Sequence, residues 1–262
     1  MISYPHIDPV IVKIGPFSLR WYGLMYILGF VSSYVLVLYQ VKRKTLKIER
    51  SQIDDLLFAL ILGLIIGARL GYVLFYNIGF YIQNPLEIFQ VWHGGMSFHG
   101  GLIGTLIAGF IVVKRQGFDF FKIADLIIPT CPVGIGLGRI GNFINGELFG
   151  KPSTLPWAMV FPQGGQIPRH PSQLYEAFFE GLLLFVTLWL YKDRKKRDGD
   201  VFALFLMLYG LFRIFCEFFR APDLQVGYIM GILTMGQLLS FLMILTGVFV
   251  KWYIASRRPL IQ

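Results

Sequence analysis

Long apolar stretches recur along this 262-residue chain, and they constrain its fold more than any other feature. A helix needs about 20 apolar residues to cross the hydrocarbon core of a bilayer. Seven stretches approach or reach that length, namely 21–40, 56–76, 97–113, 125–140, 173–191, 201–219 and 234–254. Because only helices and closed barrels satisfy backbone polar groups in lipid, the sequence predicts an all-α polytopic membrane protein with about seven transmembrane helices.

The composition agrees with a membrane location. Hydrophobic residues make up 55% of the chain and charged residues 15%, against roughly 45–50% and about 25% in soluble domains. The net charge of +9 would suit nucleic acid in a soluble protein. Here the cations cluster between apolar stretches, which favours a membrane surface instead. The two cysteines, Cys131 and Cys216, have no metal-site spacing, so no metal, cofactor or disulfide is expected.

The stretch 125–140 is the weakest of the seven, because it is short and contains Pro129, Pro132 and several glycines. A membrane tolerates such a segment where protein rather than lipid surrounds it. We therefore predict a broken or re-entrant helix there. Neither a repeat of domain size nor a linker divides the sequence, so we expect one integral membrane domain over residues 1–262.

Lysine and arginine are distributed unevenly between the links, and cytoplasmic links are the ones that they enrich. The first, third and fifth links and the C-terminal tail hold Lys42, Arg43, Lys44, Lys47, Arg50, Lys114, Arg115, Lys122, Lys192, Arg194, Lys195, Lys196, Arg197, Lys251, Arg257 and Arg258. This distribution predicts an N-terminus outside and a C-terminus in the cytoplasm. Outer-face loops are then expected around 77–95, 141–172 and 220–233.

Polar residues gather at 138–150, which reads Gly-Arg-Ile-Gly-Asn-Phe-Ile-Asn-Gly-Glu-Leu-Phe-Gly. An arginine in the middle of a span, here Arg139, costs about 2.5–3.5 kcal/mol on insertion scales and therefore suggests a function. Its guanidinium suits a phosphodiester. Neighbouring glycines would let backbone N–H groups approach the same anion. The alternative is an arginine that snorkels to the interface, with glycines that serve only helix packing.

Arg213 lies within the stretch 201–219, and Glu217 follows four residues later on the same helical face. Either the two form a self-contained ion pair, or Arg213 is a second cation for the same anion and Glu217 orients it. Arg220 lies near the outer boundary, where we expect an interfacial anchor.

Two glutamates, Glu176 and Glu180, share one face of the stretch 173–191. Acidic side chains in a span require partners within the bundle. Arg69 and Arg169 are the candidates that the sequence offers.

The tripeptide His-Gly-Gly occurs at His93 and again at His99. Imidazole takes a proton near neutral pH, which makes His99, at the mouth of the stretch 97–113, a candidate general base. A structural histidine at the interface is the alternative, and we favour it for His93. Tyr22 opens the first stretch, either as part of an interfacial aromatic belt or as a donor to a buried polar group.

Residues 138–150 resemble a signature of the bacterial phosphatidylglycerol–prolipoprotein diacylglyceryl transferases, Gly-Arg-x-Gly-Asn-Phe-x-Asn-x-Glu-x-x-Gly. Every fixed position is matched. The segments 20–26, 94–101, 169–176 and 212–223 are also similar to family segments. The resemblance thus covers most of the chain.

The resemblance implies a reaction, its partners and its residues. A diacylglyceryl group moves from phosphatidylglycerol to the thiol of a lipobox cysteine in a prolipoprotein, a thioether forms, and glycerol phosphate leaves. This first step of lipoprotein maturation takes place in the bacterial inner membrane, with the active site toward the outer face. The implied catalytic residues are Tyr22, His99, Arg139 and Arg213, and the implied substrate-binding residues are Arg139, Asn142, Asn145, Glu147, Gly150 and Glu217.

Under this hypothesis His99 accepts the thiol proton, and Arg139 and Arg213 meet the departing phosphate. Glu147 positions the loop, and Gly150 permits its turn. Neighbouring carboxylates should then leave part of both guanidinium groups unsatisfied, beside a lipid-accessible cavity. The competing hypotheses are a transporter or lipid flippase, which often has inverted repeats and paired discontinuous helices, and another phospholipid-headgroup or acyl transferase.

Overall fold

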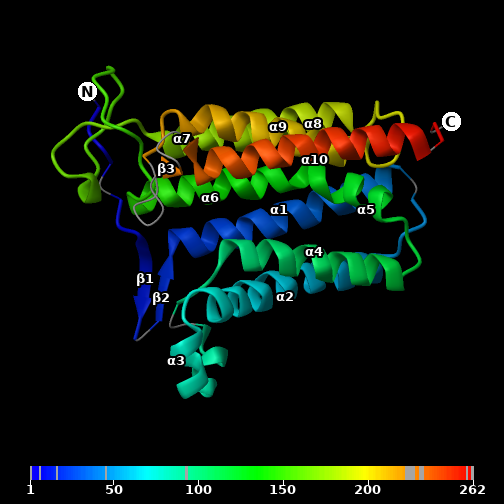
Figure 1. The fold of residues 1–262 in the computed structure, drawn as a ribbon, viewed down its shortest axis with the longest axis horizontal. Coiled ribbons are helices and arrows are strands. Elements are labelled where there is room, and N and C mark those ends of the chain that lie inside the picture. Colours follow the sequence, from blue (N-terminus) through cyan, green and yellow to red (C-terminus); the bar gives the residue numbers. More distant parts are fainter. Residues whose placement is uncertain are drawn as a thin grey trace. The chain divides into compact units, whose positions relative to one another are not determined.

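The computed structural model describes residues 2–5, 7–15, 17–44, 46–91, 94–221, 228–229, 233–257 and 259–260. Helices dominate these residues (Figure 1). The α-helices are α1 (Trp21–Arg43), α2 (Arg50–Phe75), α3 (Ile78–Gln83), α4 (Phe98–Arg115), α5 (Phe120–Ile127), α6 (Cys131–Asn145), α7 (Ser172–Glu176), α8 (Leu184–Tyr191), α9 (Asp200–Glu217) and α10 (Met235–Arg257). Short 3-10 helices lie at Pro85–Phe89, Ile128–Thr130 and Pro162–Gly164, and a π-helix lies at Ala177–Leu183.

Each of the seven apolar stretches overlaps a helix. Among the described helices, five segments are long and apolar enough to cross a membrane, namely α1, α2, α5–α6, α7–α8 and α10. This supports a mostly helical, multi-pass membrane protein. The other two long helices are α4 and α9, and α9 carries three charged residues, Asp200, Arg213 and Glu217. A count of seven spans and the orientation of the termini therefore stay predictions.

The chain forms two compact units, one made of Met1–Val37 and Ala124–Gln262 and the other of Leu38–Ile123. In the second unit, α2 packs along α4. Gly63, Gly67 and Gly71 are spaced by four, a pattern that predicts close helix contact. A Cβ on Gly71 would lie 2.7 Å from Cα of Gly100, and one on Gly67 would lie 2.8 Å from Cα of Gly104, so the prediction is confirmed.

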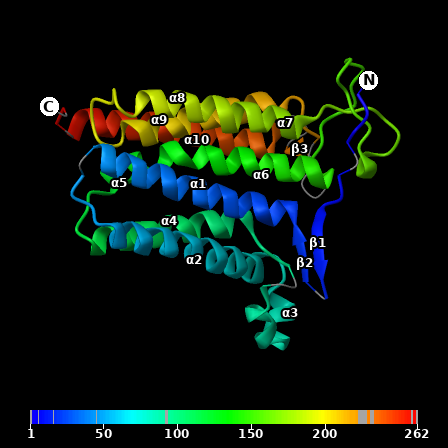
Figure 2. The same cartoon turned by 180° about the vertical axis from the view of Figure 1, so that it is seen from behind.

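The first unit contains the bundle that positions the candidate site. In both views α9 lies beside α10, and the end of α6 lies at the same end of the bundle as the start of α7 (Figures 1 and 2). Helix α6 passes very close to the π-helix, since a Cβ on Gly181 would stand 2.6 Å from Cα of Gly136. Leu184, Leu188 and Val201, all fully buried, form a core cluster between α8 and α9.

The helical run at the weakest apolar stretch extends beyond residues 125–140 on both sides. Helices α5 and α6 and the 3-10 turn between them form one helical run, Phe120–Asn145. Pro129 lies in the first turn of the 3-10 helix and Pro132 in the first turn of α6, positions where a missing N–H costs little. The predicted break is thus limited to a single 3-10 turn. The helical run extends beyond the apolar stretch because proline at a helix start preserves the run.

Two antiparallel ribbons depart from an all-α fold. Strand β1 (Val10–Ile14) pairs with β2 (Phe17–Arg20), and β3 (Tyr228–Ile229) pairs with β4 (Leu233–Thr234). Gly15 lies in the β1–β2 turn with φ +59°, a conformation that glycine adopts readily.

The three expected outer-face loops differ in how much regular structure they contain. The segment 77–95 is not irregular, because it holds α3 and the 3-10 helix Pro85–Phe89. Beyond the end of α6, the segment 141–172 is mainly irregular, with one 3-10 turn. Most of 220–233 lies outside the described residues.

Candidate active site

Arg139 of α6 contacts two glutamates from the neighbouring helical run. Its Nε lies 2.9 Å from Oε2 of Glu176, and its Nη2 lies 3.3 Å from Oε2 of Glu180. Both glutamate side chains are fully buried. A buried carboxylate requires a close cation or several hydrogen bonds, and Arg139 supplies the cation.

Arg213 of α9 meets the same two glutamates from another side. Its Nη1 lies 2.7 Å from Oε2 of Glu176 and 3.5 Å from Oε1 of Glu180, and its Nη2 lies 2.5 Å from Oε1 of Glu217. The ion pair between Arg213 and Glu217 that the i, i+4 spacing predicts is therefore present. It is not self-contained, because it joins a larger network.

Arg220 belongs to this network, so the expected interfacial anchor was wrong. Its side chain is 7% exposed, and Nη1 lies 3.3 Å from Oε1 of Glu176. Glu217, 3.9 Å from Nε of Arg220, also accepts a hydrogen bond from Oγ1 of Thr234 at 3.0 Å. We call the six charged residues the arginine–glutamate cluster: Arg139, Arg213, Arg220, Glu176, Glu180 and Glu217.

The partners first considered for the two glutamates, Arg69 and Arg169, were also wrong. Arg69 donates to backbone carbonyls of the segment 87–95, including that of Gly95 at 3.2 Å. Arg169 donates to the carbonyls of Gly164 and Gly150 at 3.2 and 3.4 Å. Both arginines therefore brace loops.

The cluster contains as many carboxylates as guanidinium groups. The side chains of Arg139 and Arg213 nevertheless remain 19% and 13% exposed. Among the hydrogen bonds and ion pairs of the described residues, Nη1 of Arg139 and Nε of Arg213 have no partner. Each guanidinium therefore keeps a nitrogen with which it can donate to an anion.

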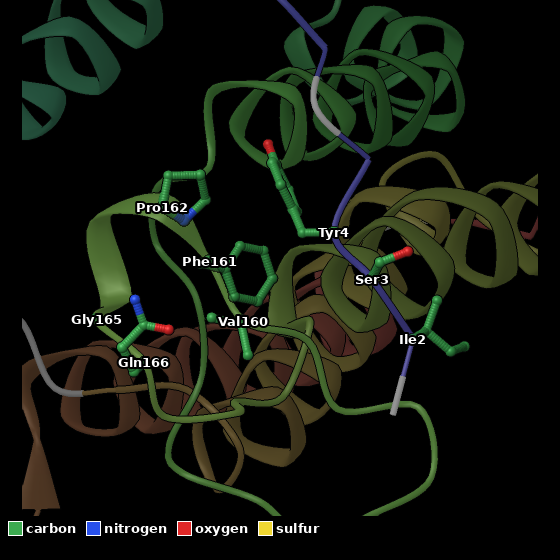
Figure 3. Close-up of a pocket in the computed structure, with 8 residues that line it drawn as sticks. All are labelled: Ile2, Ser3, Tyr4, Val160, Phe161, Pro162, Gly165 and Gln166. Carbon is green, nitrogen blue, oxygen red and sulfur yellow. The ribbon is translucent and has the colours of Figure 1, made fainter.

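A hollow of about 570 Å³ lies away from these arginines. It is lined by Ile2, Ser3, Tyr4, Val160, Phe161, Pro162, Gly165 and Gln166. Figure 3 shows Tyr4 beside Phe161 and Pro162 at this hollow. Neither arginine lines it, so it is not the lipid-accessible cavity expected beside Arg139 and Arg213.

The polar residues of 138–150 gather around Glu147. Its Oε1 accepts from Nδ2 of Asn142 at 2.9 Å and from Nδ2 of Asn145 at 3.1 Å. Tyr22 of α1 lies near Glu147 and Asn142, and its hydroxyl contacts the hydroxyl of Tyr26 at 3.1 Å. Four predicted site residues thus come together at the end of α6.

Gly150 is required by close packing rather than by a turn. A Cβ at this position would lie 2.6 Å from Cβ of His170 and 2.8 Å from its carbonyl oxygen. Gly150 does not have a positive φ, whereas Gly146, which ends α6, has φ +66°. The turn that needs glycine is therefore at Gly146.

The glycines of α6 serve helix packing. A Cβ on Gly136 would lie 3.1 Å from Cα of Gly181, and one on Gly141 would lie 2.9 Å from Cδ2 of Tyr22. Because these glycines are inside an α-helix, their N–H groups are committed to helical hydrogen bonds. The expected amide cradle for an anion is thus not formed here. Gly138 differs, since a Cβ there would meet open space.

The contact between Tyr4 and the last turn of α6 was not predicted from the sequence. Its hydroxyl donates to the carbonyls of Phe143 at 2.6 Å and of Ile144 at 3.0 Å, in the last turn of α6. Burial raises the pKa of Tyr4. The last carbonyls of a helix lack intrahelical donors, and the Tyr4 hydroxyl supplies a donor at this point. The two carbonyls that it contacts lie between Asn142 and Asn145. Its place in a polar N-terminal segment gave no signal of this role.

His99 lies in the first turn of α4, after the N-cap Ser97, whose Oγ accepts from the N–H of Gly100 at 3.2 Å. Its side chain is outside the described part of the structure, as is all of His93. The base role of His99 therefore stays a prediction.

Known proteins resemble this chain along nearly its full length. A family model described as prolipoprotein diacylglyceryl transferase matches residues 9–253. Proteins named phosphatidylglycerol–prolipoprotein diacylglyceryl transferase are similar to it: that of Geobacter sulfurreducens is 49% identical, covering 98% of this chain and 99% of its own. The one from Desulfotalea psychrophila is 52% identical, covering 94% and 92%, and the one from Pseudomonas paraeruginosa is 51% identical, covering 95% and 94%. The chain therefore belongs to the prolipoprotein diacylglyceryl transferase family, as the residues 138–150 predicted.

Proposed function

We propose that this protein transfers the diacylglyceryl group of phosphatidylglycerol to the thiol of a lipobox cysteine, the first step of lipoprotein maturation. The reaction forms a carbon–sulfur bond and breaks the bond between that carbon and a phosphate oxygen, so glycerol phosphate leaves with the bonding electrons. One observation carries the proposal: Arg139 and Arg213 meet on one buried carboxylate of Glu176, inside a chain that matches the family over residues 9–253.

We assign the phosphate to the two guanidinium groups that keep an unpartnered nitrogen, Nη1 of Arg139 and Nε of Arg213. The glutamates make the cluster neutral before lipid arrives, which lowers the cost of placing arginines in a membrane. Donors that are already oriented stabilise charge as it develops on the leaving phosphate, and removal of one such donor typically costs about 100- to 1,000-fold in rate.

His99 is our candidate for the base that accepts the thiol proton. The thiolate is the nucleophile, and a free thiol has a pKa of about 8.5, so a base near neutral pH assists the reaction. Support comes from the His-Gly-Gly segment 94–101, which resembles the family motif. Normal turnover by His99→Gln would remove this role.

The remaining predicted residues support the lipid-binding end of α6. Asn142 and Asn145 are held by Glu147 and, in this proposal, hydrogen-bond the headgroup. The hydroxyl of Tyr22 also hydrogen-bonds the headgroup in this proposal. Gly150 allows its backbone to approach His170 closely, and Glu217 orients Arg213.

The proposed location is the bacterial inner membrane, with seven spans, the candidate site toward the outer face and the C-terminus in the cytoplasm. Support comes from the lysines and arginines of the first, third and fifth links and the C-terminal tail. A C-terminal fusion to green fluorescent protein should fluoresce, and one to alkaline phosphatase should be inactive. The reverse pattern would invert the topology.

Incubation of purified protein with phosphatidylglycerol and a lipobox peptide tests the activity. Mass spectrometry should find the peptide heavier by one diacylglyceryl unit, with the added mass on the cysteine. A flippase would leave the peptide unchanged, and an acyl transferase would add a single acyl chain. Either of those results would overturn the proposed function.

A further inference from the structure

Two buried amide oxygens beside the residues 138–150 have no hydrogen-bond partner among the described residues. They are Oδ1 of Asn145 and Oε1 of Gln173. The Gln173 residue is only 1% exposed. Buried polar atoms in folded proteins are almost always hydrogen-bonded, so each oxygen calls for a donor that the described residues do not supply.

The orientation of both amides is fixed by Glu147. Nε2 of Gln173 donates to the backbone carbonyl of Glu147 at 2.6 Å, and Nδ2 of Asn145 donates to its Oε1 at 3.1 Å. A flipped amide would put its oxygen against an oxygen of Glu147, and since both can only accept, that orientation is excluded. The unpartnered atoms are therefore the amide oxygens, and the ligand that they require is a hydrogen-bond donor.

The two amides follow the arginine–glutamate cluster toward the end of α6. Gln173 precedes Glu176 by three residues in the same helical run, and Asn145 follows Arg139 by six residues in α6. At about 1.5 Å per helical residue, the two residues lie about 4.5 Å and about 9 Å along the helix axes from those cluster members. A lipid whose phosphate meets the arginines would thus have its headgroup within reach of these acceptors if it points toward the end of α6.

We infer that the two amide oxygens accept hydrogen bonds from the hydroxyl groups of the donor lipid's glycerol headgroup, and that Gln173 sets headgroup specificity. The inference rests on the proposed transferase function. A glycerol headgroup attached to phosphate offers neutral hydroxyl donors a few bonds beyond the phosphate. Acceptors that are buried and unpartnered without lipid select for such donors, because an analogue without hydroxyls leaves them unpaired.

The test compares phosphatidylglycerol with phosphatidylpropanol, which keeps the phosphate and a three-carbon headgroup but lacks both hydroxyls. The kcat/KM for diacylglyceryl transfer to a lipobox peptide is measured with each lipid in mixed micelles. The wild-type protein should prefer phosphatidylglycerol by at least about tenfold. Gln173→Met, which keeps the side-chain length but removes the acceptor, should lower that preference by about tenfold, mainly through the value for phosphatidylglycerol.

General damage to the fold lowers both rates and leaves their ratio unchanged, so the ratio separates recognition from structure. Ser172→Ala is the matched control, since this buried neighbour bonds the Leu148 carbonyl at 3.0 Å and should leave the preference intact. If Gln173→Met is too slow to assay, thermal stabilisation by glycerol phosphate is compared with that by propyl phosphate. The variant should lose the difference that the wild-type protein shows.

Three results keep the inference and the proposed function apart. A wild-type protein without preference, or a Gln173→Met variant with the wild-type preference, would overturn the inference, since the amide oxygen then binds only water. A wild-type protein that makes no heavier peptide from either lipid would overturn the proposed function instead.

Discussion

Arg139 and Arg213 bind the same atom, Oε2 of Glu176, at 2.9 and 2.7 Å. The two arginines come from α6 and α9, and the glutamate ends α7, so one buried carboxylate joins three helical segments. Two guanidinium groups repel each other unless a carboxylate lies between them. Glu176 therefore holds the two cations close together.

Glu176→Gln should destabilise the protein by about 3–5 kcal/mol, because it leaves buried cations without their shared partner. Thermal unfolding in detergent measures the loss. Asp55→Asn is the control, since that side chain is exposed and should change stability by less than about 0.5 kcal/mol. Equal stability of the two variants would mean that Glu176 does not hold the arginines together.

Gly150→Ala and Gly138→Ala should have opposite effects. A Cβ on Gly150 would collide with His170, and such overpacking costs about 1–3 kcal/mol or more. A Cβ on Gly138 meets open space, and alanine gains about 0.5–1 kcal/mol over glycine inside a helix. Melting temperatures of the two purified variants provide the comparison, and a stable Gly150→Ala protein would contradict the packing described for Gly150.

Tyr4→Phe should lower the free energy of unfolding by about 1–3 kcal/mol, because the Ile144 carbonyl loses its donor. Tyr253→Phe, which removes a hydroxyl from a side chain that is 42% exposed, should have little effect. Transfer by Tyr4→Phe should fall as well, since the carbonyls lie between Asn142 and Asn145. Unchanged stability would show that Tyr4 does not cap α6.

His170 should make the stability of the segment 146–171 depend on pH. Burial and the nearby charge of Lys151 lower the pKa of His170 below its usual value. The unfolded chain, with a histidine pKa of about 6.5, then binds the proton more readily than the folded protein, so stability decreases as the pH falls below about 6.5. Melting temperatures between pH 8 and 5 should decrease more for wild type than for His170→Gln, and parallel curves would contradict the assignment.

Much of the helical architecture could be predicted because apolar length and glycine spacing are local signals. The pattern of Gly63, Gly67 and Gly71 predicted close contact, and a Cβ on Gly71 would indeed stand 2.7 Å from Gly100. The family was also predictable, since the residues 138–150 match a long pattern of fixed positions. The β1–β2 ribbon was missed because its strands, of five and four residues, are too short for a clear periodic pattern.

Tertiary partners were harder to predict. Glu176 could be seen to need a cation, but which arginine it meets depends on helix neighbours that periodicity does not determine. Gly150 was assigned to a turn, although its requirement comes from His170, twenty residues away in the chain. Gln173 gave no signal at all, because only the structure shows that its oxygen has no donor among the described residues.

The transfer rate of Arg139→Gln tests the central claim most directly, namely that buried guanidinium groups meet the departing phosphate. The variant is purified, its folded state is verified by its melting temperature, and product is measured as lipobox peptide heavier by a diacylglyceryl unit. We predict a decrease in kcat/KM of about 100- to 1,000-fold while the protein remains folded. A folded Arg139→Gln protein that turns over at the wild-type rate would contradict the claim.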